Sequence, residues 1–178
     1  MLTSGKDACS AWVLRFLPLI RTGGKVLDLA AGSGRHTRLL LDHSYRVHAV
    51  DRDATALMPL AGPRCLVEAI DLETGAPWQL DADYDGIIVT NYLFRPLLPA
   101  ITSALAPGGV VIYETFAQGN ERFGHPRNPD FLLWTGELLE AFRGLTIVAF
   151  EQGEVTLPRP AVVQRIAAVN GPLGQLPR

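Results

Sequence analysis

Two glycines and three aspartates in the first half of the chain have the residue types and spacing to bind a nucleoside. Gly32 and Gly34 follow a short apolar segment and let the backbone turn tightly against a ligand. Asp28 precedes them, and Asp51 and Asp71 each follow a later apolar segment. Carboxylates at such positions accept hydrogen bonds from a ribose diol or a purine amine, whereas they repel a pyrophosphate. These residues therefore predict a nucleoside site.

The segments that must position these residues alternate between strand and helix patterns. The expected strands are 25–29, 46–50, 64–70, 86–90, 110–115, 145–150 and 161–169. The expected helices are 7–20, 35–43, 95–105 and 136–142, with a short helix from Asp53 that fades by Gly62. Alternating strands and helices form a parallel sheet covered on both faces, and the last two strands, with no helix between them, pair antiparallel. We expect an α/β, doubly wound, mostly parallel seven-stranded sheet with a C-terminal antiparallel hairpin.

Length and composition favour one globular domain. The chain has 178 residues, 48% of them hydrophobic and 19% charged, which excludes disorder as the main state. We expect a single domain, 1–178, with an N-terminal helix within 1–21, a lid loop at 116–131 and a loose tail at 170–178. Ligands of doubly wound sheets bind at the carboxyl ends of the strands, near the point where the strand order reverses.

Charge and cysteine content limit the partners and the compartment. The net charge is −2, so duplex nucleic acid is not an expected partner. Residues 96–113 carry no charge, but prolines and glycines interrupt them, so we expect no membrane partner. Cys9 and Cys65 have no metal or redox spacing, and the N-terminus shows no secretory pattern, which favours a cytoplasmic location.

The glycine turn resembles motif I of the class I S-adenosylmethionine-dependent methyltransferases, commonly D/E-x-G-x-G-x-G. Asp28, Ala30, Gly32 and Gly34 occupy the matching positions, with Ala30 in place of the first glycine. Dinucleotide sites usually carry a further glycine where this chain has Thr37. The resemblance covers nearly the whole chain, including the terminal hairpin and the turn 107–109 before the fifth strand.

The resemblance implies S-adenosyl-L-methionine as cofactor and a set of residues that would bind it. The set is Asp28, Ala30, Gly32, Ser33, Gly34, Asp51, Arg52, Asp71, Leu72, Asn91 and Tyr92. The turn would line the methionine and ribose part, and Asp51 would hold the ribose hydroxyls. Arg52 would lie against the adenine and Asp71 would accept from its amine. Asn91 and Tyr92 would stand near the methyl group, where an aromatic face also stabilises a sulfonium cation.

Each of these positions also has a purely structural interpretation. The turn 32–34 could simply join a strand to a helix, and Asp51 could cap the next helix, although Asp53 is the better cap. Asp71 could be a turn residue. Tyr92 could pack on the first helix. The histidines form no cluster with metal-ligand spacing, so no metal is expected. They are His36, His43, His48 and His125.

Missing motifs point to a small-molecule acceptor. Asn91 and Tyr92 follow the fourth strand without the two prolines found in enzymes that methylate amino groups of nucleic-acid bases. No Pro-Cys dipeptide supports a cytosine nucleophile, and no lysine follows Lys25 to build a ribose 2′-O-methyltransferase site. The chain is similar to compact bacterial methyltransferases of the tellurite-resistance and thiopurine type.

The loop 116–131 is the expected substrate lid, because a long aperiodic loop in a compact domain is often functional. Arg122 and Arg127 could clamp an anionic substrate, or could form ion pairs within the loop. The candidate catalytic groups are Tyr92, Glu114 and His125. A soft nucleophile such as a thiol, selenide or telluride needs no general base, whereas an oxygen or nitrogen acceptor would use Glu114 or His125.

Two other functions remain open from the sequence. The first is an NAD-linked oxidoreductase, against which Thr37 and the lack of a Ser/Tyr/Lys constellation count. The second is a non-catalytic subunit of methyltransferase fold. Its partner would dock on the apolar face of Trp12, Phe16 and Ile20, unless that face packs on the chain's own sheet.

Overall fold

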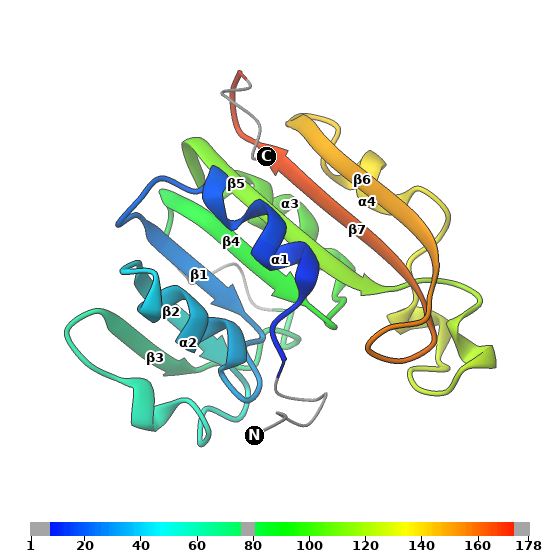
Figure 1. Ribbon diagram of the computed structural model, residues 1–178, viewed down its shortest axis with the longest axis horizontal. Coiled ribbons are helices and arrows are strands. Elements are labelled where there is room, and N and C mark those ends of the chain that lie inside the picture. The colour runs from blue at the N-terminus through cyan, green and yellow to red at the C-terminus, as the bar shows by residue number, and fades with distance from the viewer. Residues whose placement is uncertain (1–7, 76–80, 173–178) are drawn as a thin grey trace.

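A seven-stranded sheet with the order β3-β2-β1-β4-β5-β7-β6 forms the centre of the computed structural model, which describes residues 8–75 and 81–172 (Figure 1). The strands are β1 (Lys25–Leu29), β2 (Arg46–Asp51), β3 (Cys65–Ala69), β4 (Tyr84–Thr90), β5 (Leu105–Phe116), β6 (Thr146–Val155) and β7 (Ala161–Val169). Strands β1 to β5 run parallel, and β7 pairs antiparallel with both β5 and β6. The expected fold class is confirmed.

Helices cover both faces of this sheet (Figure 1). They are α1 (Ala11–Phe16), α2 (Arg35–Asp42), α3 (Leu98–Ser103) and α4 (Glu137–Ala141). Single 3-10 turns occupy Leu17–Leu19, Met58–Leu60, Arg95–Leu97, Asn120–Arg122 and Pro129–Phe131. Side chains of α1 and α2 belong to one apolar cluster, and those of α3 and α4 belong to the cluster on the opposite face. No helix of the described segments is long and apolar enough to cross a bilayer.

The N-terminal helix is shorter than expected. Ser10 caps α1, and Pro18 sits in the 3-10 turn that replaces the last turn, since proline lacks the N–H that an α-helix requires. Trp12, Phe16 and Ile20 are each 2% exposed and pack against the sheet. The apolar face is therefore internal, so the interpretation of it as a docking surface is wrong. Residues 1–7 lie outside the described part of the chain.

The structure differs from two other expectations about elements, at Asp53 and at Asn170. Asp53 accepts a hydrogen bond from the Thr55 N–H (3.0 Å), as a cap would, but only a 3-10 turn containing Pro59 follows. At the C-terminus, Asn170 is tightly held rather than loose. It exchanges backbone hydrogen bonds with Gly108 and Gly109, and its side chain donates to two carbonyls at the start of β5. The rest of the expected tail, 173–178, lies outside the described residues.

Candidate functional site

The glycine turn lies where the strand order reverses, between the carboxyl ends of β1 and β4. Ala30, Gly32 and Gly34 all have left-handed backbones, with φ of 54°, 57° and 76°. Only glycine adopts this conformation without strain, so Ala30 is a strained position, and strain of this kind clusters at functional sites. A Cβ on Gly32 would meet no atom within 4 Å, so the space above the turn is open.

Asp51, the last residue of β2, fastens this turn. Its Oδ2 accepts a hydrogen bond from the Gly32 N–H (2.8 Å), and its Oδ1 accepts one from the Asp53 N–H (3.1 Å). A carboxylate has about four acceptor positions, so Asp51 retains capacity for a ligand. The carboxylate therefore shapes the turn and stays partly open to solvent.

Asp71 lies beside Asp51, because the Ile70 N–H donates to the Asp51 carbonyl (3.0 Å). Asp71 is exposed, and its Oδ1 accepts from the Glu73 N–H (3.0 Å), as in the turn interpretation. Leu72 packs partly against the core, and Arg52 is exposed. Both carboxylates thus lie at the carboxyl edge of the sheet, and each is close enough to Tyr92 to raise its pKa.

Asp28 does not belong to that open edge, contrary to the expected convergence of three carboxylates. It is 2% exposed and accepts a hydrogen bond from Thr37 Oγ1 (2.6 Å) in the first turn of α2. Burial raises its pKa to about 6, although the Thr37 hydroxyl and the Arg35 guanidinium act in the opposite direction. Thr37, which replaces a dinucleotide-type glycine, is the partner that holds this carboxyl beneath the turn.

Tyr92 follows β4 and stands next to the acidic edge. Asn91 before it has a left-handed backbone (φ 55°), and the Asn91 N–H donates to the Glu114 carbonyl (2.9 Å). The Tyr92 ring packs in the cluster on the face opposite α1, so the interpretation that it packs on the first helix is wrong. Burial raises the pKa of Tyr92, and the carboxylates of Glu73, Asp71 and Asp51 raise it further.

The hydroxyl of Tyr92 is the unusual atom of the site. Tyr92 Oη is buried and has no hydrogen-bond partner within the described residues. The Glu73 carboxylate lies close enough to raise the pKa of Tyr92 both through its charge and as an acceptor for the hydroxyl, although the two groups fall short of a well-formed hydrogen bond. A buried polar group without a well-formed hydrogen bond costs about 1–3 kcal/mol, so the Tyr92 hydroxyl beside Glu73 is a costly arrangement within the fold.

Glu114, a candidate base, is already engaged. Its Oε1 accepts from Ser10 Oγ (2.9 Å), and its Oε2 pairs with Arg165 Nη1 (3.3 Å). The Ser10 N–H in turn donates to His36 Nε2 (3.0 Å). Burial and Arg35 lower the pKa of His36 to about 4, so its imidazole is neutral at pH 7. The sequence did not indicate this cluster, because its members are far apart in the chain.

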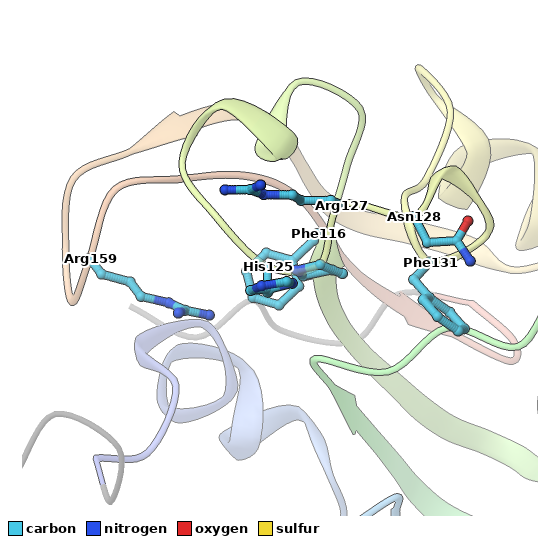
Figure 2. Close-up of a pocket in the computed structure, with 7 residues that line it drawn as sticks. Phe116, His125, Arg127, Asn128, Phe131 and Arg159 are labelled. Atoms are coloured by element: carbon cyan, nitrogen blue, oxygen red, sulfur yellow. The ribbon is translucent and has the colours of Figure 1, made fainter.

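The loop after β5 forms a hollow of about 520 Å³ together with the connection between β6 and β7 (Figure 2). Its lining residues are Phe116, His125, Pro126, Arg127, Asn128, Phe131 and Arg159. Arg127 lines this hollow, but Arg122 does not, since Arg122 pairs with Glu154 and lies over the Phe123 ring (5.1 Å). The second arginine of the hollow is Arg159, which sequence reasoning missed because only the fold brings it to the loop.

Arg95 fixes the far end of this loop, a role that the sequence did not reveal. Its guanidinium makes two hydrogen bonds to the Glu137 carboxylate (2.7 and 3.0 Å). It also donates to the carbonyls of Asp130 (2.7 Å) and Leu132 (2.8 Å) and lies over the Trp134 ring. The wall of the hollow that carries Phe131 is therefore tied to the segment that follows β4.

Comparison of the sequence with known proteins finds similarity to one methyltransferase. No family model matches the sequence. The chain is 35% identical over 97 residues to the protein-L-isoaspartate O-methyltransferase of Chlorobaculum tepidum, a match that covers 50% of this chain and 43% of that protein. The chain thus spans less than half the length of this curated relative.

Solved methyltransferase structures match over most of the chain. TehB from Haemophilus influenzae has a TM-score of 0.73 at 18% identity, covering 91% of this chain and 62% of that one. The 1,6-didemethyltoxoflavin-N1-methyltransferase of Burkholderia thailandensis, solved with bound 1,6-didemethyltoxoflavin and S-adenosylhomocysteine, has a TM-score of 0.70 at 23% identity, covering 96% of this chain and 80% of that one. The chain therefore has the Rossmann-like fold of the class I S-adenosylmethionine-dependent methyltransferases.

Proposed function

We propose that this protein is a methyltransferase that binds S-adenosylmethionine at the glycine turn and methylates a small molecule. One observation carries the proposal: the open acidic edge of Asp51 and Asp71 lies beside the glycine turn and close to Tyr92. Ribose hydroxyls and an adenine amine are donors that fit these acceptors, whereas the phosphates of a dinucleotide do not. The residues present therefore fit the nucleoside part of the cofactor.

The chain's own residues divide the work of binding and orientation. Asp51 would accept hydrogen bonds from the ribose diol, and Asp71 would accept one from the adenine amine. The backbone from Ala30 to Gly34 would line the methionine and ribose part of the cofactor. The Tyr92 ring would lie beside the positive charge of the sulfonium and stabilise it. When bound, S-adenosylmethionine supplies a methyl group on a sulfonium whose thioether is a good leaving group. Alignment of the acceptor and exclusion of water are then the main contributions of the protein.

The available side chains support an acceptor that needs no general base, because most candidate bases already have hydrogen-bond partners. Glu114 is engaged by Ser10 and Arg165, and His36 is buried and holds the Ser10 N–H. His125, exposed on the hollow, is the remaining candidate for an oxygen or nitrogen acceptor. A thiol or another soft nucleophile would react without it.

Two further points support a small acceptor in a reducing compartment. The methyltransferase of Burkholderia thailandensis is solved with the small molecule 1,6-didemethyltoxoflavin, and this chain shares its fold over 96% of its own length. Cys9 and Cys65 are both free thiols, which supports the proposed cytoplasmic location.

The proposal is tested by calorimetric titration of S-adenosylhomocysteine into the wild type, Asp51→Asn and Asp53→Asn. Asp51→Asn removes the charge expected to hold the ribose, so we expect affinity to fall about 10- to 100-fold. Asp53→Asn is the matched control, because Asp53 is exposed and bonds only its own turn, and it should bind within about twofold of wild type. An absence of binding at millimolar ligand, or equal losses in both variants, would refute the proposal.

A further inference from the structure

The hollow after β5 is built from three segments that are distant in the sequence. Phe116 at the end of β5 forms its floor, the loop from His125 to Phe131 forms one wall, and Arg159 reaches over it from the β6–β7 connection (Figure 2). Its volume of about 520 Å³ lies within the ordinary range for small-molecule sites. It is therefore large enough for a molecule with one or two rings.

The hollow offers flat apolar surface to a ligand. Phe116 is mostly buried, whereas Phe131 keeps 46% of its surface exposed. An exposed aromatic at the wall of a concave site contributes to binding when a ligand covers it. Arg95 and its bonds to the Asp130 and Leu132 carbonyls hold that wall in place. The wall is thus formed before a ligand arrives.

The rim of the hollow carries positive charge without acidic partners. Within the described residues, neither Arg127 nor Arg159 forms an ion pair, whereas neighbouring Arg122 and Arg165 both do. The Arg159 guanidinium lies 5.5 Å from the centre of the Phe116 ring, which holds this cation over the floor. Two such cations on one rim favour an anionic group between them.

The hollow also lies near the place where the methyl group would stand. The Asn91 N–H donates to the Glu114 carbonyl, so the end of β4 is level with Glu114. Phe116 is two residues further along β5 on the same face, a distance of about 7 Å. Because β4 and β5 are themselves about 4.8 Å apart, a ligand must span about 8–9 Å to occupy the hollow and extend to Asn91.

We propose that the hollow is the acceptor subsite and that it selects a small aromatic acid. The ring would lie against Phe116 and Phe131, and its carboxylate or phosphate would bind Arg127 and Arg159. This inference rests on the proposed methyl transfer. In that reaction the acceptor's nucleophilic atom forms a bond to the methyl carbon, the carbon–sulfur bond breaks with its electron pair on sulfur, and any acceptor proton passes to His125 or to water.

The test measures binding of matched probes to protein saturated with S-adenosylhomocysteine. The probes are 1-naphthoate, 1-naphthyl phosphate, the uncharged 1-naphthamide, and acetate, which has the charge but no ring. We expect both aromatic anions to bind at least tenfold more tightly than the amide and than acetate. The preference between carboxylate and phosphate identifies the kind of acid.

Arginine variants assign the effect to the hollow. Arg127→Gln and Arg159→Gln should each weaken naphthoate binding about tenfold, whereas Arg122→Gln, whose guanidinium is paired with Glu154, should leave it unchanged. Equal affinity for the acid and the amide, no effect of either variant, or no binding of any aromatic probe to the S-adenosylhomocysteine-loaded protein would overturn this inference alone. Failure of S-adenosylhomocysteine itself to bind would overturn the proposed function instead.

Discussion

Asp28 and His36 are both buried beneath the glycine turn, and burial moves their pKa values in opposite directions. The pKa of Asp28 rises to about 6, and that of His36 falls to about 4. At pH 7 the fold therefore holds a buried carboxylate on β1 and a neutral imidazole on α2. Each shift of about two pKa units corresponds to a change of about 3 kcal/mol in the free energy of unfolding across the pH interval between the unfolded and folded pKa values.

The two shifts have opposite consequences for stability against pH. Because the folded-state pKa of Asp28 is raised above 3.8, the contribution of Asp28 to the free energy of unfolding decreases as the pH rises from about 4 to about 6. Because the folded-state pKa of His36 is lowered below 6.5, the contribution of His36 to the free energy of unfolding decreases as the pH falls from about 6.5 to about 4. In the wild type these two changes largely cancel over the same interval.

Single substitutions should separate these contributions. Relative to wild type, the free energy of unfolding of Asp28→Asn should increase by about 2–3 kcal/mol between pH 4 and pH 6.5, because only the His36 contribution remains. That of His36→Gln should decrease by a similar amount. Urea unfolding at a series of pH values measures both, and curves that stay parallel to wild type would contradict the assignment.

At the scale of elements, the sequence predicted the strands whose bounds follow from local hydrophobic patterns. The bounds of β1 and β7 match the expected strands. Asp51 is the last residue of β2, and Asp71 follows the end of β3 by two residues. The expected helix after Asp53 failed because a single cap does not outweigh a proline in the next turn. Strand β6 runs to Val155, further than expected, because its pairing with β7 continues through Gly153.

In the candidate site, too, features set by consecutive residues were predicted, whereas features set by tertiary packing were not. Motif spacing predicted the glycine turn, since its residues are consecutive. It could not predict that Asp28 turns inward to Thr37, because the side-chain environment depends on how α2 packs. Arg95 and Arg159 were missed because each acts on residues more than thirty positions away, as in the Arg95–Glu137 pair.

The Arg95 contacts predict that one side chain stabilises the whole wall of the hollow. Arg95→Gln would leave Glu137 without its partner and free the carbonyls of Asp130 and Leu132. We expect a loss of about 2–4 kcal/mol in the free energy of unfolding, measured by chemical denaturation, and faster proteolysis within 130–137. Arg143→Gln, which breaks an exposed pair with Glu140, is the control and should change stability by less than about 0.5 kcal/mol.

At the scale of the whole molecule, β7 joins the terminal hairpin to the parallel part of the sheet. Its side chains contribute to the apolar clusters on both faces, with Ile166 in one and Ala167 in the other. Trp12 Nε1 of α1 also donates to the Ile166 carbonyl (3.1 Å). The first helix and the last strand are therefore parts of one core.

This arrangement predicts a single cooperative unfolding transition for the chain. In a Trp78→Phe variant, which removes the third tryptophan of the chain, fluorescence reports on α1 through buried Trp12 and on the loop through Trp134, whereas far-ultraviolet circular dichroism reports on the sheet as a whole. We expect the two signals to change at the same denaturant concentration. A fluorescence change that precedes the loss of circular dichroism would show that α1 or the loop unfolds separately from the sheet.

The proposed cofactor and acceptor residues come from different stretches of the chain. The first set lies within 28–92, at the ends of β1 to β4, and the second lies in 116–131 and at Arg159. The two stretches meet at the seam between β4 and β5. Substitutions in the second stretch can therefore accumulate in a lineage without disturbing the first. Evolution, or a laboratory library confined to those positions, can change which molecule is modified while the source of the methyl group stays the same.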